Sequence, residues 1–321
     1  MEEIITETTM IFKIDKENDG RQILSFLKST LKISTSALAA LKRDEKGILV
    51  NGKHENVRYV LRENDILSIN EKDSADDVNE TIIPVDLPLN IIFENDDIII
   101  ADKPAYMPTH PSHNHNDDTL ANAIAYKFKQ EEKPFVFRPI GRLDRNTSGL
   151  SLIAKNPISA SFLYYARQRD MIRKKYVALL CGRLECDGKL HTIDTYMKRQ
   201  EDSVIVRCVS GSDEESSFRA ITHYRVLFSS DDLSVVEAIP ETGRTHQLRV
   251  HFAHIGHAIL GDDIYGKESE VITRHALHAA YLSIPLPYTT EQTEFTSPPP
   301  EDMKRAFKSI CGTELEDIYI K

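Results

Sequence analysis

The sequence has no apolar run close to the ~18 residues that a membrane-spanning helix needs. Its first residues, Met1–Ile4, are acidic and lack the basic start of a secretory signal. Cysteine is scarce, and the spacing of the four cysteines fits neither a zinc site nor a disulfide scaffold: Cys181, Cys186, Cys208 and Cys311. These absences argue against a membrane-spanning helix and a disulfide-stabilised secreted domain, and we expect a cytoplasmic protein.

Positive charge is in short supply over the whole chain, because 50 acidic residues face 40 basic ones and the formal net charge is −10. This balance argues mildly against nucleic-acid binding, but the sign of a local face matters more than the total. Between Arg167 and Arg199, nine basic residues accompany four acidic ones, which gives this segment a net charge of +5. A basic surface on an acidic body is therefore compatible with the sequence.

What is present suffices for two folded units. Hydrophobic residues make up 40% of the chain and charged residues 28%, which is ordinary for a globular protein with a sizeable core. A chain of 321 residues has room for one large domain and a smaller one. Residues 73–84 begin with a polar, acidic stretch and are predicted to form a linker. We therefore expect a small unit at 1–72 and a large domain at 85–321.

Hydrophobic periodicity predicts the elements of both units. In the small unit we expect helices over 21–32 and 37–43, with Ser34 near the start of the second, and then strands at 48–53 and 61–69. In the larger domain, strands outnumber helices, which indicates an α+β fold around a long mixed, largely antiparallel sheet with flanking helices. The expected strands are 89–93, 98–101, 150–154, 176–181, 203–208, 218–228 and 233–239, and the expected helices are 119–129, 157–169 and 245–255.

The segment Gly141–Leu150 contains the most informative pattern, a carboxylate between two arginines that is followed by a Thr-Ser-Gly turn. An arginine close to Asp144 favours the ionised carboxylate. An ionised aspartate suits a nucleophile or an electrostatic stabiliser better than a general acid. On local composition alone, a surface loop in which Arg142, Asp144 and Arg145 simply pair remains an equal alternative.

Four segments, taken in order, resemble the RluA-type family of RNA pseudouridine synthases. The Asp144 loop is similar to the family's catalytic loop, and residues 173–179 are similar to its K-x-Y strand. The other two are 87–112, which contains Lys103-Pro104 and His110-Pro111, and 241–302, which contains Gly243-Arg244-Thr245-His246-Gln247-Leu248-Arg249, Gly261-Asp262 and Tyr265-Gly266. One such match would be weak evidence, but the ordered set is highly specific.

The resemblance has two departures. Position 141 is glycine where the family usually has histidine, so any orienting role of that imidazole is missing. Residues 283–287 replace a more usual Phe-x-His-Pro stretch. Neither change affects the aspartate, and both bear on loop geometry.

The small unit resembles the αL RNA-binding module that often precedes the catalytic domain in RluA-type enzymes. The pattern consists of two short helices followed by a hairpin that begins at Ile48-Leu49-Val50-Asn51-Gly52-Lys53. Candidates for contact with RNA phosphates are Lys28, Lys32, Lys42 and Arg43. The alternative is that these side chains only solvate the outer faces of the helices.

The resemblance implies a role for each matched residue. Asp144 would be the nucleophile, Tyr176 would stack on the base, and Arg249 would pair with the aspartate, with Arg244 as the competing candidate. Arg142 would fill the gap that a flipped base leaves in the RNA. The predicted contacts to RNA are Arg142, Arg145, Arg244, His246, Lys174 and Lys175.

The reaction that the resemblance implies needs no metal or cofactor, because it breaks one nitrogen–carbon bond and makes one carbon–carbon bond without redox chemistry. The histidines at 246, 251, 254 and 257 lack a defined zinc spacing, and we predict no metal site.

We therefore expect a monomeric enzyme that isomerises specific uridines to pseudouridine in structured RNA, in ribosomal RNA more than in transfer RNA, with no membrane partner. The alternative is a catalytically inactive RNA-binding or RNA-folding protein that retains the synthase fold. A carboxylate-nucleophile hydrolase is a third interpretation, but it lacks the second carboxylate that such hydrolysis needs.

Overall fold

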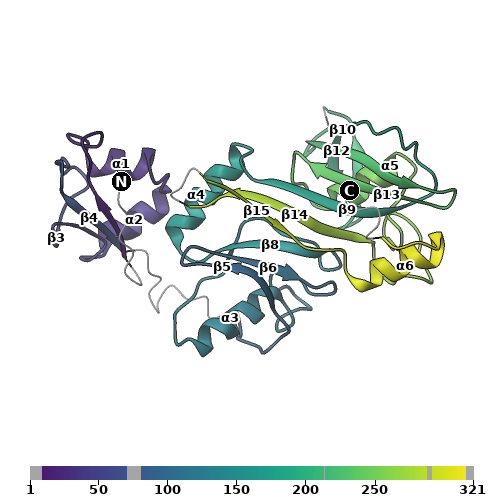
Figure 1. The fold of residues 1–321 in the computed structure, drawn as a ribbon, viewed down its shortest axis with the longest axis horizontal. Helices are drawn as coiled ribbons and strands as arrows, with labels where there is room; N and C mark the ends of the chain where they lie inside the picture. The colour runs from purple at the N-terminus through teal and green to yellow at the C-terminus, as the bar shows by residue number, and fades with distance from the viewer. Residues whose placement is uncertain (1–8, 71–80, 213, 288–290, 316–321) are drawn as a thin grey trace.

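The computed structural model describes residues 9–70, 81–212, 214–287 and 291–315. The first of these ranges forms a separate four-stranded antiparallel sheet in the order β1-β4-β2-β3, with two helices packed on it (Figure 1). Its elements are β1 (Thr9–Lys13), α1 (Ile23–Ser29), α2 (Thr35–Arg43), β2 (Ile48–Val50), β3 (Lys53–His54) and β4 (Ile66–Asn70). The Ser34 hydroxyl accepts a hydrogen bond from the backbone N–H of Ala37 at 3.1 Å and caps α2, as the sequence predicts.

The N-terminal unit is seated on helix α4 (Pro157–Gln168) of the larger domain. Ile158 of α4 is 1% exposed and belongs to the hydrophobic core of the N-terminal unit, together with residues such as Phe26 and Leu38. The Lys32 ammonium lies 4.9 Å from the ring centroid of Tyr165, also in α4. Lys32 thus contacts protein and is not one of the outward-facing lysines that the helical pattern predicts. The predicted acidic linker, 73–84, lies outside the described residues except for 81–84.

The larger domain is built on one sheet of eleven strands, whose longest path runs β11-β10-β12-β13-β9-β14-β8-β6-β5. All pairs are antiparallel except β14 with β8, which confirms the prediction of a long mixed, largely antiparallel sheet. The strands are β5 (Asn90–Glu94), β6 (Ile98–Lys103), β7 (Arg138–Pro139), β8 (Ser148–Ala154), β9 (Arg173–Cys181), β10 (His191–Arg199), β11 (Arg207–Ser210), β12 (Phe218–Ser229), β13 (Leu233–Pro240), β14 (Leu277–Pro285) and β15 (Gln292–Thr296).

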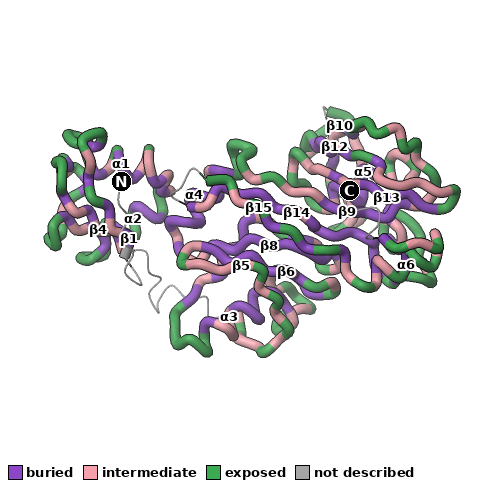
Figure 2. Tube along the Cα trace, in the orientation of Figure 1, coloured by how far each residue is buried: buried purple, intermediate pink, exposed green. Residues whose placement is uncertain are grey.

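Helices cover both faces of this sheet, and the alternation of side chains along β6 shows how. Ile98 and Ile100 pack in one core with Leu163 of α4, whereas Ile99 packs in another with Ile124 of α3 (Leu120–Gln130). Successive residues of a strand point to opposite faces of the sheet. A strand that is covered by helices on both faces therefore needs a continuous apolar run. Figure 2 shows the buried strands continuing through the centre of the sheet. The remaining helices are α5 (Gln247–His254) and α6 (Glu301–Cys311).

The predicted strand at 203–208 is wrong for most of its length. Residues 201–206 form a turn in which the Ser203 hydroxyl accepts hydrogen bonds from the backbone N–H groups of Ile205 and Val206, and pairing begins only at Arg207. The predicted helix at 245–255 begins two residues later, because His246 has a left-handed backbone with φ +58°. Strand β14, which lies between β9 and β8, was not predicted.

Candidate active site

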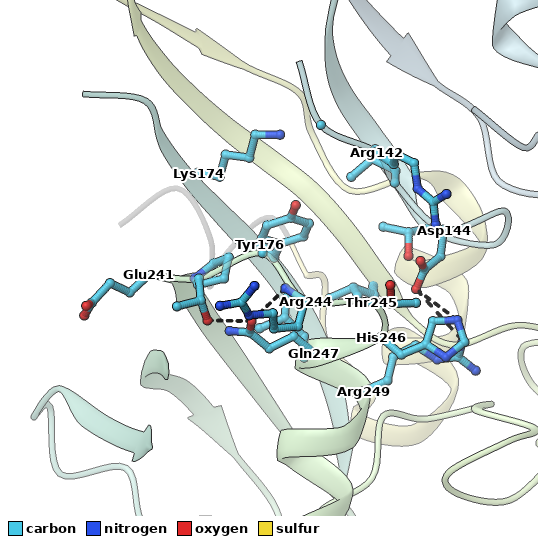
Figure 3. Close-up of a pocket in the computed structure, with 18 of the residues that line it drawn as sticks. Arg142, Asp144, Lys174, Tyr176, Glu241, Arg244, Thr245, His246, Gln247 and Arg249 are labelled. Carbon is cyan, nitrogen blue, oxygen red and sulfur yellow. Dashed lines mark hydrogen bonds and ion pairs between the residues drawn. The ribbon is translucent and has the colours of Figure 1, made fainter. Parts of the chain in front are cut away.

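A cavity of about 410 Å³ opens where three segments of the larger domain meet. Two are loops, residues 140–144 before β8 and residues 240–246 after β13, and the third is the start of β9. Figure 3 shows that the labelled side chains around this cavity are almost all polar, with Asp144, His246 and Arg249 on one side and Lys174 on the other. The cavity therefore combines three carboxylates, Asp144, Asp170 and Glu241, with several cationic groups.

The loop that carries Asp144 is held residue by residue by hydrogen bonds from buried side chains. The Thr109 hydroxyl donates to the Leu143 carbonyl at 3.0 Å, and the Arg274 guanidinium donates to the Asn146 carbonyl at 2.9 Å. Lys103 Nζ donates to the Arg145 carbonyl at 3.2 Å. These donors come from distant parts of the chain, so the loop is fixed from outside as well as by its own turn, in which the Thr147 N–H donates to the Asp144 carbonyl at 3.1 Å.

Lys103 is fully buried at the base of this loop. Its Nζ also donates to the carbonyls of Pro104 at 2.9 Å and Met107 at 2.7 Å, which accounts for all three ammonium protons. Burial and the nearby Arg274 lower the pKa of Lys103 to about 7, although Asp144 and Asp102 oppose that shift. The lysine therefore acts here as a three-way hydrogen-bond donor.

Two buried histidines hold the end of the same loop in their neutral form. His278 Nε2 donates to the Ser297 carbonyl at 3.0 Å, so its Nδ1 accepts from the Ser148 hydroxyl at 3.0 Å. His275 Nε2 lies 2.9 Å from the Thr147 hydroxyl, and burial lowers the pKa of His275 to about 3. Uncharged imidazoles are the form that a buried position next to Arg274 favours.

Arg249, on α5, stands between two carboxylates. Its Nε and Nη2 donate to the two oxygens of Asp262, each at 2.7 Å, and this pair is almost completely buried. Its Nη1 lies 4.0 Å from Asp144 Oδ2. Burial alone raises the pKa of Asp262, but Arg249 and the backbone N–H groups of Ile264 and Tyr265 outweigh it and leave that pKa lowered. Asp262 thus fixes the guanidinium with one edge turned toward Asp144.

His246 approaches Asp144 from the same side, with Nε2 3.9 Å from Asp144 Oδ2. Its Nδ1 lies 2.9 Å from the Tyr265 hydroxyl, which accepts from the backbone N–H of Arg207 at 2.8 Å. Tyr265 therefore donates to Nδ1, and the ring proton of a neutral His246 sits on Nε2, facing the carboxylate. Burial lowers the pKa of His246, which favours this neutral form, although Asp144 opposes the shift.

Tyr176 and Lys174 extend from the same face of β9 into the cavity, because residues two apart in a strand share a face. Tyr176 is 8% exposed, and burial and then Asp144 raise its pKa, so the phenol stays protonated. Burial and then Arg167 lower the pKa of Lys174 to about 8.

Comparisons with known proteins agree on one family. Residues 97–254 match the RNA pseudouridylate synthase family. The chain is 34% identical over 279 residues to the Bacillus subtilis protein named uncharacterized RNA pseudouridine synthase YjbO, covering 87% of this chain and 95% of that one. The chain belongs to the RNA pseudouridylate synthase family. This confirms the family and the enzyme class that the motifs predict.

Two further similar proteins, one known by sequence and one by structure, test the RluA-type resemblance and the fold class. This synthase is 34% identical over 242 residues to ribosomal large subunit pseudouridine synthase D of Zymomonas mobilis, covering 71% of this chain and 74% of that one. Among solved structures it is similar to human RNA pseudouridylate synthase domain containing 1, with 31% identity and a TM-score of 0.54, over 66% of this chain and 83% of that one. The RluA-type resemblance and the fold class are therefore confirmed.

The synthase does not bring all of the predicted site residues into the cavity. Lys175 points to the opposite face of β9, where its Nζ lies 3.0 Å from Glu237 Oε2. Arg244 lines the cavity, but its side chain donates to the Arg219 carbonyl at 3.2 Å and lies over the ring of Phe218. Arg142 lines the mouth and is exposed, and Arg145 is exposed outside the cavity lining. The predicted RNA contacts of these arginines and of Lys175 stay predictions.

Sequence reasoning assigned no role to Asp262 or Tyr265, which orient Arg249 and His246. The signal was available, since both belong to the matched segment around Gly261-Asp262 and Tyr265-Gly266. Lys103 and Arg274 were also inside matched segments, but nothing local shows that they reach the Asp144 loop. Arg167, at the end of α4, lies outside those segments and lines the cavity as well.

No group of three metal-ligating side chains occurs among the described residues of the synthase. Of the four neighbouring histidines, His246 bonds Tyr265, His251 lies 3.1 Å from the Thr195 hydroxyl, and His257 donates to the Cys181 carbonyl at 3.0 Å. Over the same described ranges, none of the helices has the length and apolar character to span a membrane.

Proposed function

We propose that this protein converts specific uridines in structured RNA to pseudouridine, in ribosomal RNA more than in transfer RNA, with Asp144 as the nucleophile and without a cofactor. The observation that carries the proposal is the placement of Asp144. Its carboxylate is 25% exposed in the cavity wall and has Arg249 and His246 within 4.0 Å on its inner side. A carboxylate so placed is accessible to a substrate in the cavity and lies beside a buried guanidinium, which suits a nucleophile.

The proposed isomerisation needs few other groups from the protein. The bond between N1 of uracil and C1′ of ribose breaks, the base turns, and C5 bonds to C1′, while C5 loses a proton and N1 gains one. Asp144 supplies the carboxylate that adds to the nucleoside and leaves when the new bond forms. Arg249 provides a positive charge next to this carboxylate, and His246 lies on the same side of it.

The base must leave the RNA stack to reach Asp144, at a cost of a few kcal/mol. A cavity of about 410 Å³ accommodates one nucleoside, and the Tyr176 ring supplies a stacking surface within it. Arg142 is exposed and lines the cavity, and we expect it to fill the gap left in the RNA. The preference for ribosomal RNA rests on the similarity to proteins named ribosomal large subunit pseudouridine synthase D.

The deciding experiment compares pseudouridine maps of total RNA from a strain lacking the gene, after addition of either purified wild-type protein or Asp144→Ala. Sites that are missing in the deletion strain and restored only by wild type would establish the activity and name the target. An unchanged map, with RNA still bound, would instead support an RNA-binding protein that retains the synthase fold.

Substituting Tyr176 is expected to separate stacking from the hydroxyl group. Tyr176→Ala should lower the rate of conversion about 5- to 150-fold, because base stacking on an aromatic ring contributes ~1–3 kcal/mol. Tyr176→Phe keeps the ring and should retain most of the rate. Single-turnover kinetics on the mapped RNA, with thermal unfolding as the control for folding, would test this. Equal losses in both variants would contradict the stacking role.

We also propose that residues 1–72 form an RNA-binding module and residues 85–321 the catalytic domain, joined by 73–84. Support comes from the separate sheet and core of the N-terminal unit. Deleting the module would uncover Ile158, so point substitutions test its role more cleanly.

Lys42 and Arg43 end α2 and are exposed, which makes them the module's best candidates for phosphate contact. The double variant Lys42→Gln, Arg43→Gln is expected to weaken RNA binding. It should also reduce the slope of log affinity against log salt by about 0.7–0.9 for each phosphate that the protein no longer neutralises. Arg305→Gln, on the exposed side of α6, serves as the control for the loss of one positive charge elsewhere on the surface. An unchanged salt slope in the double variant would remove the module's proposed role.

A further inference from the structure

Two cations that the chemistry of Asp144 does not use share one wall of the cavity. Lys174 comes from the start of β9, and Arg167 comes from the last turn of α4. They reach the same place from different elements, and Figure 3 shows Lys174 well separated from the group around Asp144.

The distances from these cations to the points that a Cβ would occupy on Gly141 and on Gly243, one in each cavity loop, show where the cations lie. Lys174 Nζ lies 3.4 Å, and Arg167 Nη1 3.8 Å, from the point that a Cβ on Gly141 would occupy. Arg167 Nη2 lies 3.1 Å from the corresponding point on Gly243. The guanidinium thus spans the space between the two loops, beside the ammonium, and a side chain at Gly243 would crowd it.

The positive charge at this wall is not neutralised within the described part of the chain. Neither Arg167 nor Lys174 forms an ion pair or donates a side-chain hydrogen bond there, so their donors remain available to a ligand. Besides Asp144, two carboxylates line the cavity, Asp170 and Glu241. Glu241 Oε2 lies 3.0 Å from His223 Nε2. The charged neighbour that acts on Lys174 is Arg167. Two adjacent cations beside a cavity with open donors favour an anionic ligand.

We propose that Arg167 and Lys174 bind one phosphate of the RNA backbone next to the flipped uridine. The inference rests on the proposed function, because it assigns the second anchor of the same substrate. The planar guanidinium donates two parallel hydrogen bonds to phosphate oxygens, and the ammonium adds a point charge. The phosphate then holds the sugar from one side while Asp144 approaches from the other.

Equilibrium binding of small probes tests this site without any need for turnover. Uridine, uridine 5′-monophosphate and uridine 3′-monophosphate would be titrated against Asp144→Asn protein, so that no reaction occurs. One of the two monophosphates should bind at least about tenfold more tightly than uridine, as expected for charge-assisted hydrogen bonds to phosphate. The same preference should disappear when Arg167→Gln or Lys174→Gln is added, and persist with Arg305→Gln.

Arg167→Lys keeps the positive charge but loses the two parallel N–H donors of the guanidinium. It should retain part of the preference for the monophosphate over uridine. Equal binding of uridine and both monophosphates would overturn the proposal, as would an equal loss with Arg305→Gln. The comparison of uridine with the two monophosphates needs only the Asp144→Asn protein. It therefore tests the proposal even if a further variant fails to fold. A phosphate preference in a protein that forms no pseudouridine would keep the site and reject the proposed function instead.

Discussion

Asp144→Asn is expected to lower the rate of pseudouridine formation by at least about 10⁴-fold while leaving RNA affinity nearly unchanged. The amide has almost the same shape as the carboxylate, so the loop that Lys103 and Arg274 hold should keep its geometry. What is lost is the negative charge that we propose attacks the nucleoside and that lies 4.0 Å from Arg249 Nη1. Affinity should survive, because phosphate contacts supply most of the binding free energy for RNA.

Asp170→Asn is the matched control, since Asp170 is a second carboxylate that lines the same cavity but belongs to neither loop. Single-turnover assays on the mapped RNA, with pseudouridine detected by mass, would be run beside filter binding. Mass spectrometry of the protein would exclude deamidation back to aspartate. Measurable conversion by a chemically pure Asp144→Asn protein would count against the nucleophile, and an equal loss in Asp170→Asn would point to a general charge effect.

Asp262→Asn is expected to cost about 3–5 kcal/mol of unfolding free energy and most of the activity, because it leaves the buried Arg249 without its carboxylate. The Arg249–Asp262 pair is 4% and 0% exposed, and both bonds are 2.7 Å. Without it, the guanidinium loses both of the short hydrogen bonds that orient its Nη1 edge toward Asp144. Chemical denaturation and single-turnover rates would measure the two effects.

The neighbouring Asp263 provides the control for this prediction. Its carboxylate lies 3.5 Å from Arg249 Nη2 but is 60% exposed, so Asp263→Asn should change stability by less than about 1 kcal/mol. The lowered pKa of Asp262 adds a pH signature. Its stabilising contribution is present above the unfolded-state pKa of about 3.9 and is lost as the pH falls through the folded-state value. Similar losses in the two variants would show that Asp262 has no special role.

Most of the elements follow from the sequence alone. The roles of Asp144 and Tyr176 came from the resemblance of short local segments to the family, and they stay predictions. Helices α3 and α4 were predicted nearly to their ends, since 3.6-residue periodicity and the caps are local. A strand at 176–181 was also predicted, but Lys174 and Lys175 were both assigned to RNA contact, and the structure of β9 places them on opposite faces.

Tertiary structure decided which of these residues act together. The choice between Arg244 and Arg249 depends on where α5 begins, because Arg249 lies inside the helix and Arg244 in the loop before it. Strand β14 was missed because its pairing with β9 and β8 joins residues about a hundred positions apart. Lys103 and Arg274 reach the Asp144 loop from 42 and 128 positions away, and Asp262 reaches Arg249 from 13 positions away. Periodicity and composition report only on near neighbours along the chain, whereas a buried charge finds its partner through the packing of the whole sheet.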